Sequence, residues 1–128
     1  MVVDTSAIIA IMLNEPDADE MLRKMARTSV RHFSAVSYVE CLMVLIGRMG
    51  EGAQQAVDAM LSRSGIVVSP VSLEQAKLAV TAFRQYGKGR HPAGLNFGDC
   101  FSYALAKSTG EPLLFRGSDF LRTDLDVA

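Results

Sequence analysis

Short apolar segments alternate along this chain with longer segments of helical periodicity, and this alternation constrains the fold more than any other feature. The segments predicted as strands are residues 1–3, 31–33, 66–68 and 112–115, with a further short one near residues 125–127. The segments predicted as helices are residues 6–13, 17–27, 51–64, 73–86 and 97–108, with another from Ser34 or Ser37 to about residue 49. Parallel strands need such crossover helices, so we expect an α/β layer structure with a mainly parallel sheet.

Two of the predicted helices and the loop between them have distinctive residue patterns. Apolar residues recur at Ala76, Val80 and Phe83, which form the apolar face of the helix predicted over residues 73–86. The glycine- and proline-rich residues 87–94 are expected to form a loop. Asn96 is the expected cap of the next helix, which places Asp99 at its third position.

Composition limits the class of protein. The chain has 128 residues, 49% hydrophobic and 21% charged, so we expect a single domain over residues 1–128. A formal net charge of -1 excludes a protein that coats nucleic acid through overall basicity, so any nucleic-acid contact must be local. The two cysteines, Cys41 and Cys100, form no CxxC motif or Cys/His cluster, which disfavours a zinc site and a disulfide scaffold.

No segment is predicted to direct the chain into or across a membrane. The first residues lead straight into structured sequence, without a basic region followed by a long apolar one. The apolar residues 36–46 are interrupted by Glu40 and are too short for a bilayer, which requires about 20 apolar residues. We therefore expect a cytoplasmic protein without membrane contact.

Four acidic residues occupy the ends of predicted elements. Asp4 and Asp119 follow strands, Asp99 opens a helix, and Glu40 lies early in another. In a parallel sheet these positions converge on one edge, where ligands usually bind. Clustered carboxylates repel one another unless a cation neutralises them, and oxygen ligands favour Mg²⁺ or Mn²⁺. Such an ion positions water and polarises a phosphodiester, which is the chemistry of phosphate-ester hydrolysis.

A simpler interpretation applies to each acid taken singly. Asp99 and Glu40 have the positions of residues that complement a helix dipole, and Asp4 has the position of a helix cap. Asp4 also ends an apolar strand that the core would bury, which is an expensive place for a charge. The combination of acids, rather than any one of them, indicates a site.

Several motifs, taken in order, make the chain resemble the PIN-domain ribonuclease toxins of the VapC type. They are residues 2–7 (VVDTSA), 38–40 (YVE), 87–91 (GKGRH), 95–104 (LNFGDCFSYA) and 113–124 (LLFRGSDFLRTD). The resemblance implies a three-layer α/β/α sandwich and a divalent-metal endoribonuclease that cuts cellular RNA and blocks translation or growth. It also implies a cognate antitoxin and a homodimer.

The resemblance also assigns roles by position. Asp4, Glu40 and Asp99 fall on the family's metal-site acids, and Ser6 falls on the small hydroxyl residue that supports the first Asp. The family's fourth acid varies in register near this strand end. The fourth ligand is therefore expected to be Asp119, or alternatively to be absent from this chain. Thr5 and Ser118 are further candidates for supporting these acids.

Basic residues near Asp99 are candidates for RNA contact. Arg84, Lys88, Arg90 and His91 are expected to form a local phosphate-binding patch, or alternatively a solvated helix end and loop. Arg116 and Arg122 flank Asp119 and pose the same choice, with an acidic antitoxin segment as a third possibility.

Two other functions compete with this interpretation. A metal-dependent phosphatase acting on small esters is disfavoured, because the chain has no P-loop, no GxGxxG and no DxD after its first strand. A catalytically inert PIN-like module that binds RNA or protein is the alternative function, and the absence of Mn²⁺ binding would favour it.

Overall fold

The computed structural model describes residues 1–128 and contains a four-stranded sheet of order β3-β2-β1-β4 in which every neighbouring pair is parallel. The strands are β1 Val2–Val3, β2 Arg31–Ser34, β3 Ile66–Ser69 and β4 Leu113–Leu114. The helices are α1 Thr5–Met12, α2 Ala18–Met25, α3 Ala35–Met49, α4 Ala53–Arg63, α5 Leu73–Tyr86, α6 Phe97–Thr109 and the 3-10 helix η1 Asp119–Arg122.

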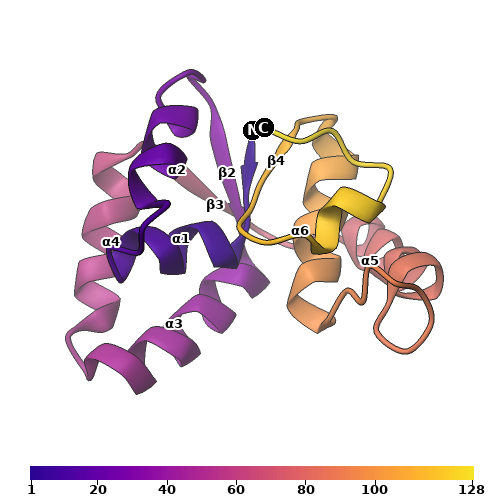
Figure 1. Cartoon of the computed structure of the whole chain (residues 1–128), viewed down its shortest axis with the longest axis horizontal. Helices are drawn as coiled ribbons and strands as arrows, with labels where there is room; N and C mark the ends of the chain where they lie inside the picture. The colour runs from indigo at the N-terminus through magenta and orange to yellow at the C-terminus, as the bar shows by residue number, and fades with distance from the viewer.

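Helices cover both faces of the sheet, with α1 to α4 on one side and α5 and α6 on the other (Figure 1). Side chains alternate between the two faces along a strand, so Val3 belongs to the first core while its neighbour Val2 belongs to the second. Leu114 and Leu113 divide in the same way. The expected three-layer α/β/α sandwich with a short parallel sheet is therefore confirmed.

The element boundaries follow local signals in the sequence. Ser34, rather than Ser37, caps α3, because its hydroxyl accepts a hydrogen bond from the Val36 N–H at 3.3 Å. Gly50 ends that helix with a φ of 86°, a left-handed value that favours glycine. The strand expected near residues 125–127 is reduced to one parallel bridge between Leu113 and Val127. No helix combines the length and apolar content that crossing a membrane would require.

The apolar face predicted for α5 is largely exposed rather than buried. Val80 and Phe83 are 51% and 45% exposed, whereas Ala79 and Ala82 are buried. The helix packs against α6 through these alanines, whose small side chains allow two helices to approach closely. Periodicity located an apolar stripe correctly but could not show which stripe the neighbouring helix covers, and the larger residues are left on the surface.

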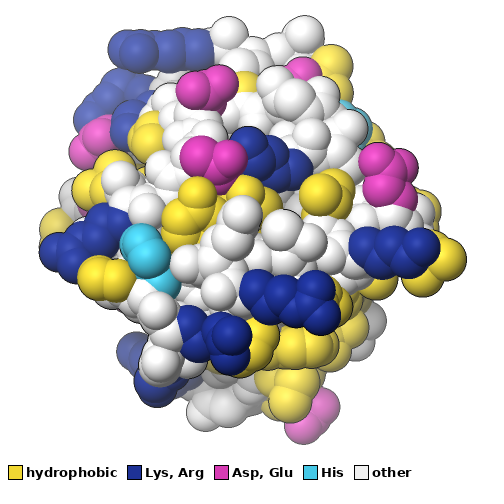
Figure 2. Space-filling view, turned by 90° about the vertical axis from the view of Figure 1, so that its right-hand side faces the viewer, with side chains coloured by type: hydrophobic (Ala, Val, Ile, Leu, Met, Phe, Trp, Pro, Cys, Tyr) yellow, Lys and Arg dark blue, Asp and Glu magenta, His cyan; other side chains and the backbone are white.

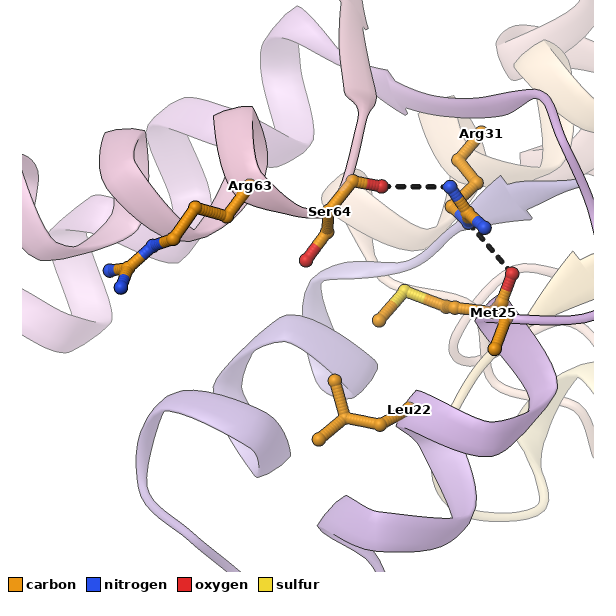
Figure 3. Close-up of a pocket in the computed structure, with 6 residues that line it drawn as sticks. Leu22, Met25, Arg31, Arg63 and Ser64 are labelled. Atoms are coloured by element: carbon orange, nitrogen blue, oxygen red, sulfur yellow. Dashed lines mark hydrogen bonds between the residues drawn. The ribbon is translucent and has the colours of Figure 1, made fainter.

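Arg31 ties together three segments at the edge of the sheet where the strands begin (Figure 3). Its Nε donates to the Met25 carbonyl at 2.7 Å and its Nη1 donates to the Ser64 carbonyl at 2.8 Å. These carbonyls end α2 and α4, where helices leave acceptors unpaired. Nη2 donates to Thr28. Arg63 also lines the pocket of about 200 Å³ between these segments, with its side chain directed away from Arg31 (Figure 3).

We expect Arg31→Met to lower the free energy of unfolding by about 2 kcal/mol, because it leaves partly buried carbonyls without a charged donor. Arg63→Met is the matched control, since Arg63 is exposed and bonds only to the Ala59 carbonyl of its own helix. Urea unfolding of both variants checks this. Equal effects of the two substitutions would contradict the anchoring role of Arg31.

Candidate functional site

Asp4 lies at the carboxyl end of β1 and is 3% exposed. Its Oδ2 accepts a hydrogen bond from the Ser6 backbone N–H at 2.9 Å, so the side chain caps α1. The same oxygen accepts from the Ser6 hydroxyl at 2.6 Å. The cap interpretation therefore holds, but it accounts for only one of the two carboxylate oxygens.

The other oxygen of Asp4 is bonded from the opposite layer. The Ser102 hydroxyl of α6 donates to Oδ1 at 2.6 Å, and the Ser37 hydroxyl of α3 lies 3.1 Å from that of Ser102. Thr5 donates to the Ser37 carbonyl at 3.3 Å. A buried carboxylate needs such donors, because burial without them carries a large desolvation penalty. The network fixes the orientation of Asp4 relative to three helices.

Glu40 lies half-buried in the second turn of α3. Burial raises the pKa of its carboxyl, the neighbouring Thr5 hydroxyl opposes that rise, and the charge of Asp4 adds to it. The carboxylate lies directly against the backbone of Gly98 in α6, where a Cβ would overlap both of its oxygens. Gly98 thus leaves the space that Glu40 occupies.

Asp99 is the third residue of α6 and forms a capping box with Asn96. Its Oδ2 accepts from the Asn96 N–H at 2.9 Å. Burial raises the pKa of the Asp99 carboxyl to about 7, although the Asn96 N–H opposes the rise. The charges of Asp4, Glu40 and Asp119 make smaller contributions to the same rise. All four predicted acids therefore share one electrostatic environment.

Asp119 is the outlying member of this group. It is exposed at the start of η1, and Ser118 precedes it without a side-chain capping bond. Its influence on the pKa of Asp99 is the smallest of those that raise it. The structure thus places Asp119 near the other acids but holds it less firmly than Asp4.

The acids are electrostatic neighbours and not a closed ligand shell. No three Asp, Glu, His or Cys side chains lie close enough together to enclose a metal ion as they stand. No Lys or Arg forms an ion pair with any of the four acids. Carboxylates with no basic partner attract a hard cation, which would draw them closer than they lie.

Three contributors escaped the sequence analysis: Ser37, Gly98 and Ser102. Ser102 and Gly98 lie within residues 95–104, one turn after Asp99 and directly before it. A fully buried serine on an otherwise apolar helix face is a signal for a polar partner, but the sequence does not identify that partner. The close approach of Glu40 to Gly98 depends on how α3 and α6, which are far apart in the sequence, pack against each other.

The basic candidates flank the start of α6. Arg84, Lys88 and Arg90 are exposed and make no ion pair, and the Arg90 guanidinium lies 5.5 Å from the centre of the Phe83 ring. His91 is held in its loop, because its Nδ1 accepts from the Ala93 N–H at 3.0 Å. Only its other ring nitrogen remains for a ligand.

The two thiols beside the acids face the core. Burial raises the pKa of Cys41 to about 12 and that of Cys100 to about 11. Thiols that stay protonated are poor nucleophiles, so the cysteines do not contribute a nucleophile to this site.

Comparisons with known proteins agree with this architecture. Residues 1–125 match the family model for the PIN domain. A "Ribonuclease VapC" from Mycolicibacterium smegmatis is 49% identical over 125 residues, which cover 98% of this chain and 97% of the relative. The crystal structure of Mycobacterium tuberculosis VapC20, described as a sarcin-ricin loop cleaving toxin, aligns with a TM-score of 0.79 at 19% identity. That alignment covers 99% of this chain and 97% of VapC20, and shows a shared fold.

We expect Gly98→Ala to remove RNA cleavage while leaving the fold intact. The new methyl group displaces a flexible carboxylate, and alanine favours a helix, so the free energy of unfolding should change by less than about 1 kcal/mol. A misplaced Glu40 should lower cleavage about 100-fold. Gly47→Ala is the control, because nothing lies within 4 Å of its Cβ position. Full activity of Gly98→Ala would show that the position of Glu40 is unimportant.

Proposed function

This chain belongs to the PIN-domain family as one of its VapC ribonucleases, the toxins of toxin–antitoxin pairs, and on that premise we propose a metal-dependent endoribonuclease whose ligands are Asp4, Glu40 and Asp99. Asp119 is the proposed fourth ligand. Residues 1–128 act as one ribonuclease domain, and the substrate is cellular RNA. The observation that carries the proposal is a group of acids without a basic partner, in which the charges of Asp4, Glu40 and Asp119 all raise the pKa of Asp99.

The donor set fits a hard divalent ion. All candidate ligands are carboxylate oxygens, which Mg²⁺ and Mn²⁺ prefer over softer metals. Such an ion, when bound, polarises the phosphodiester and lowers the pKa of a water molecule. Asp4 would be the fixed ligand, since hydroxyls on both sides hold it. Glu40 and Asp99 would lose their mutual repulsion, which now raises the pKa of Asp99.

The RNA backbone is proposed to approach along α5 and the loop before α6. Arg84, Lys88 and Arg90 supply unpaired positive charge there, close in sequence to the Asn96 cap. Figure 2 shows Lys and Arg side chains dispersed among apolar ones on this side of the molecule. Because the net charge of the chain is -1, we expect only these few basic side chains to contact the RNA phosphates, and only close to the site.

A cognate antitoxin is the proposed protein partner. VapC ribonucleases are toxins of toxin–antitoxin pairs, and a toxin–antitoxin complex from Klebsiella pneumoniae contains a chain of the same fold, with a TM-score of 0.75 at 20% identity. That alignment covers 99% of this chain and 95% of the other. The antitoxin would hold the ribonuclease inactive until it is released.

A homodimer is proposed across an apolar face that joins α3, α5 and the start of α6. Phe97 lies at its centre and lines two hollows, one of about 690 Å³ against α3 and one of about 220 Å³ against α5. Glu40 lines the hollow against α3, so this interface would border both the metal site and the path proposed for the RNA. Phe97 is 74% exposed and Met43 on α3 is 73% exposed. Exposed apolar patches of this kind usually mark interaction surfaces, and a second copy offers a self-complementary one.

Asparagine substitutions of the acids test the proposed chemistry. Asp4→Asn and Asp99→Asn should each reduce Mg²⁺- or Mn²⁺-dependent RNA cleavage by about 100-fold or more, because each removes a charged ligand. Asp119→Asn should reduce it less, since Asp119 is exposed. Asp126→Asn is the control, because Asp126 is exposed and its charge is not among those that raise the pKa of Glu40 or Asp99. Cleavage of total RNA with and without EDTA, and Mn²⁺ calorimetry, provide the measurements.

Undiminished cleavage by both Asp4→Asn and Asp99→Asn would overturn the assignment. A wild-type chain that binds no Mn²⁺ at millimolar concentration and cleaves no RNA would support the inert binding module instead.

A charge placed in the apolar face should change the oligomeric state of the protein. Met43→Glu should convert the dimer to a folded monomer at micromolar concentration, because it places a charge in the apolar face. Leu121→Glu is the control, since Leu121 is 61% exposed on η1 and lies outside that face. Light scattering coupled to size exclusion measures both. A monomeric wild-type chain would refute the dimer.

A further inference from the structure

The segment between the end of β4 and η1 carries Asp119 past the Asp4 site. Phe115 and Phe120 are buried at its two ends, whereas residues 116–119 are exposed. Gly117 adopts a φ of 99°, so the chain turns sharply within the segment. Packing alone therefore does not determine the course of this segment.

Arg116 attaches the segment to α1 through the main chain. Its backbone N–H donates to the Ser6 hydroxyl oxygen at 2.9 Å, and that hydroxyl donates to Oδ2 of Asp4 at 2.6 Å. Because the Ser6 oxygen accepts from Arg116, its single proton is directed at Asp4. The position of Arg116 is thus linked to Asp4 through one hydroxyl.

The Arg116 side chain attaches the same segment to the connection between α1 and α2. Nε donates to Oδ2 of Asp17 at 2.8 Å, and Nη1 forms an ion pair with Glu15. The two acids lie in the connection between α1 and α2, with side chains 26% and 29% exposed. Oδ1 of Asp17 is buried without a partner, so that carboxylate relies on Arg116. The guanidinium is clamped between two carboxylates.

The clamp argues against the two roles expected for Arg116 from the sequence. A guanidinium already paired with two carboxylates is a poor binder of an RNA phosphate or of an acidic antitoxin segment. The side chain is also 43% exposed, and half-exposed ion pairs contribute little to folding stability. A role in positioning accounts for both the clamp and the bond to Ser6.

We infer that Arg116, held by Glu15 and Asp17, is a positioning residue that keeps the Ser6 hydroxyl directed at Asp4 and fixes the segment that carries Asp119. The inference rests on the proposed metal site. Without the clamp, the segment would leave Ser6, and the carboxylates of Glu15 and Asp17 would be left as unpaired negative charges beside the site.

The test compares Arg116→Gln with Arg27→Gln, because Arg27 is exposed just after α2 and makes no ion pair. We expect Arg116→Gln to weaken Mn²⁺ binding about tenfold by calorimetry and to lower kcat for RNA cleavage at least about tenfold. KM should stay within about twofold, since the RNA contact is elsewhere. Arg116→Lys should recover part of the Mn²⁺ affinity, and Arg27→Gln should match the wild type.

Other outcomes overturn the inference in distinguishable ways. A raised KM and a weaker salt dependence with unchanged kcat would make Arg116 a phosphate-binding residue. A lower Tm with unchanged Mn²⁺ affinity and kcat would make the clamp purely structural. If the wild type binds Mn²⁺ and cleaves RNA but Arg116→Gln equals it, only the inference fails. If the wild type does neither, the proposed function fails and the inference fails with it.

Discussion

The site depends on the burial of one negative charge, the carboxylate of Asp4 at the end of β1. A buried carboxylate is tolerated only where donors surround it, and Ser6 and Ser102 supply them from α1 and α6, on opposite faces of the sheet. The same bonds therefore join the two helical layers at the edge of the sheet where the site lies. Ser37 extends the network to α3, the helix that carries Glu40.

This arrangement keeps the other acids closer to one another than they would stay in water. Burial, with smaller contributions from the charges of the neighbouring acids, raises the pKa of Asp99 to about 7, so the metal-free site is electrostatically unfavourable. Groups whose pKa is strongly displaced by burial and by like charge are typical of functional sites. Gly98 adds a steric condition, since only the absence of a side chain there leaves room for Glu40. The site is thus maintained by the fold against its own repulsion.

Prediction from the sequence succeeded where a local signal decides the outcome. Asn96 caps α6 and Asp99 takes its third position, as expected, because both groups bond within four residues of each other. Prediction from the sequence failed where the packing of distant segments decides which side chains are buried or paired. The α5 stripe at Val80 and Phe83 is as apolar as a buried face, yet Ala79 and Ala82 contact the core. The sequence left Arg116 open between a phosphate contact, a solvated side chain and an acidic antitoxin segment, whereas the side chain pairs with Glu15 and Asp17.

The sequence by itself determined the alternation of strands and helices, the parallel sheet that follows from it, and the acids at the ends of its elements. These depend on periodicity, capping and chain direction, which act over a few residues. The tertiary structure alone decided that Ser102 satisfies Asp4, that Gly98 makes space for Glu40, and that Arg116 is clamped beside Ser6. Each of these contacts joins residues separated by more than fifty positions, and only the docking of helices across the sheet brings them within reach.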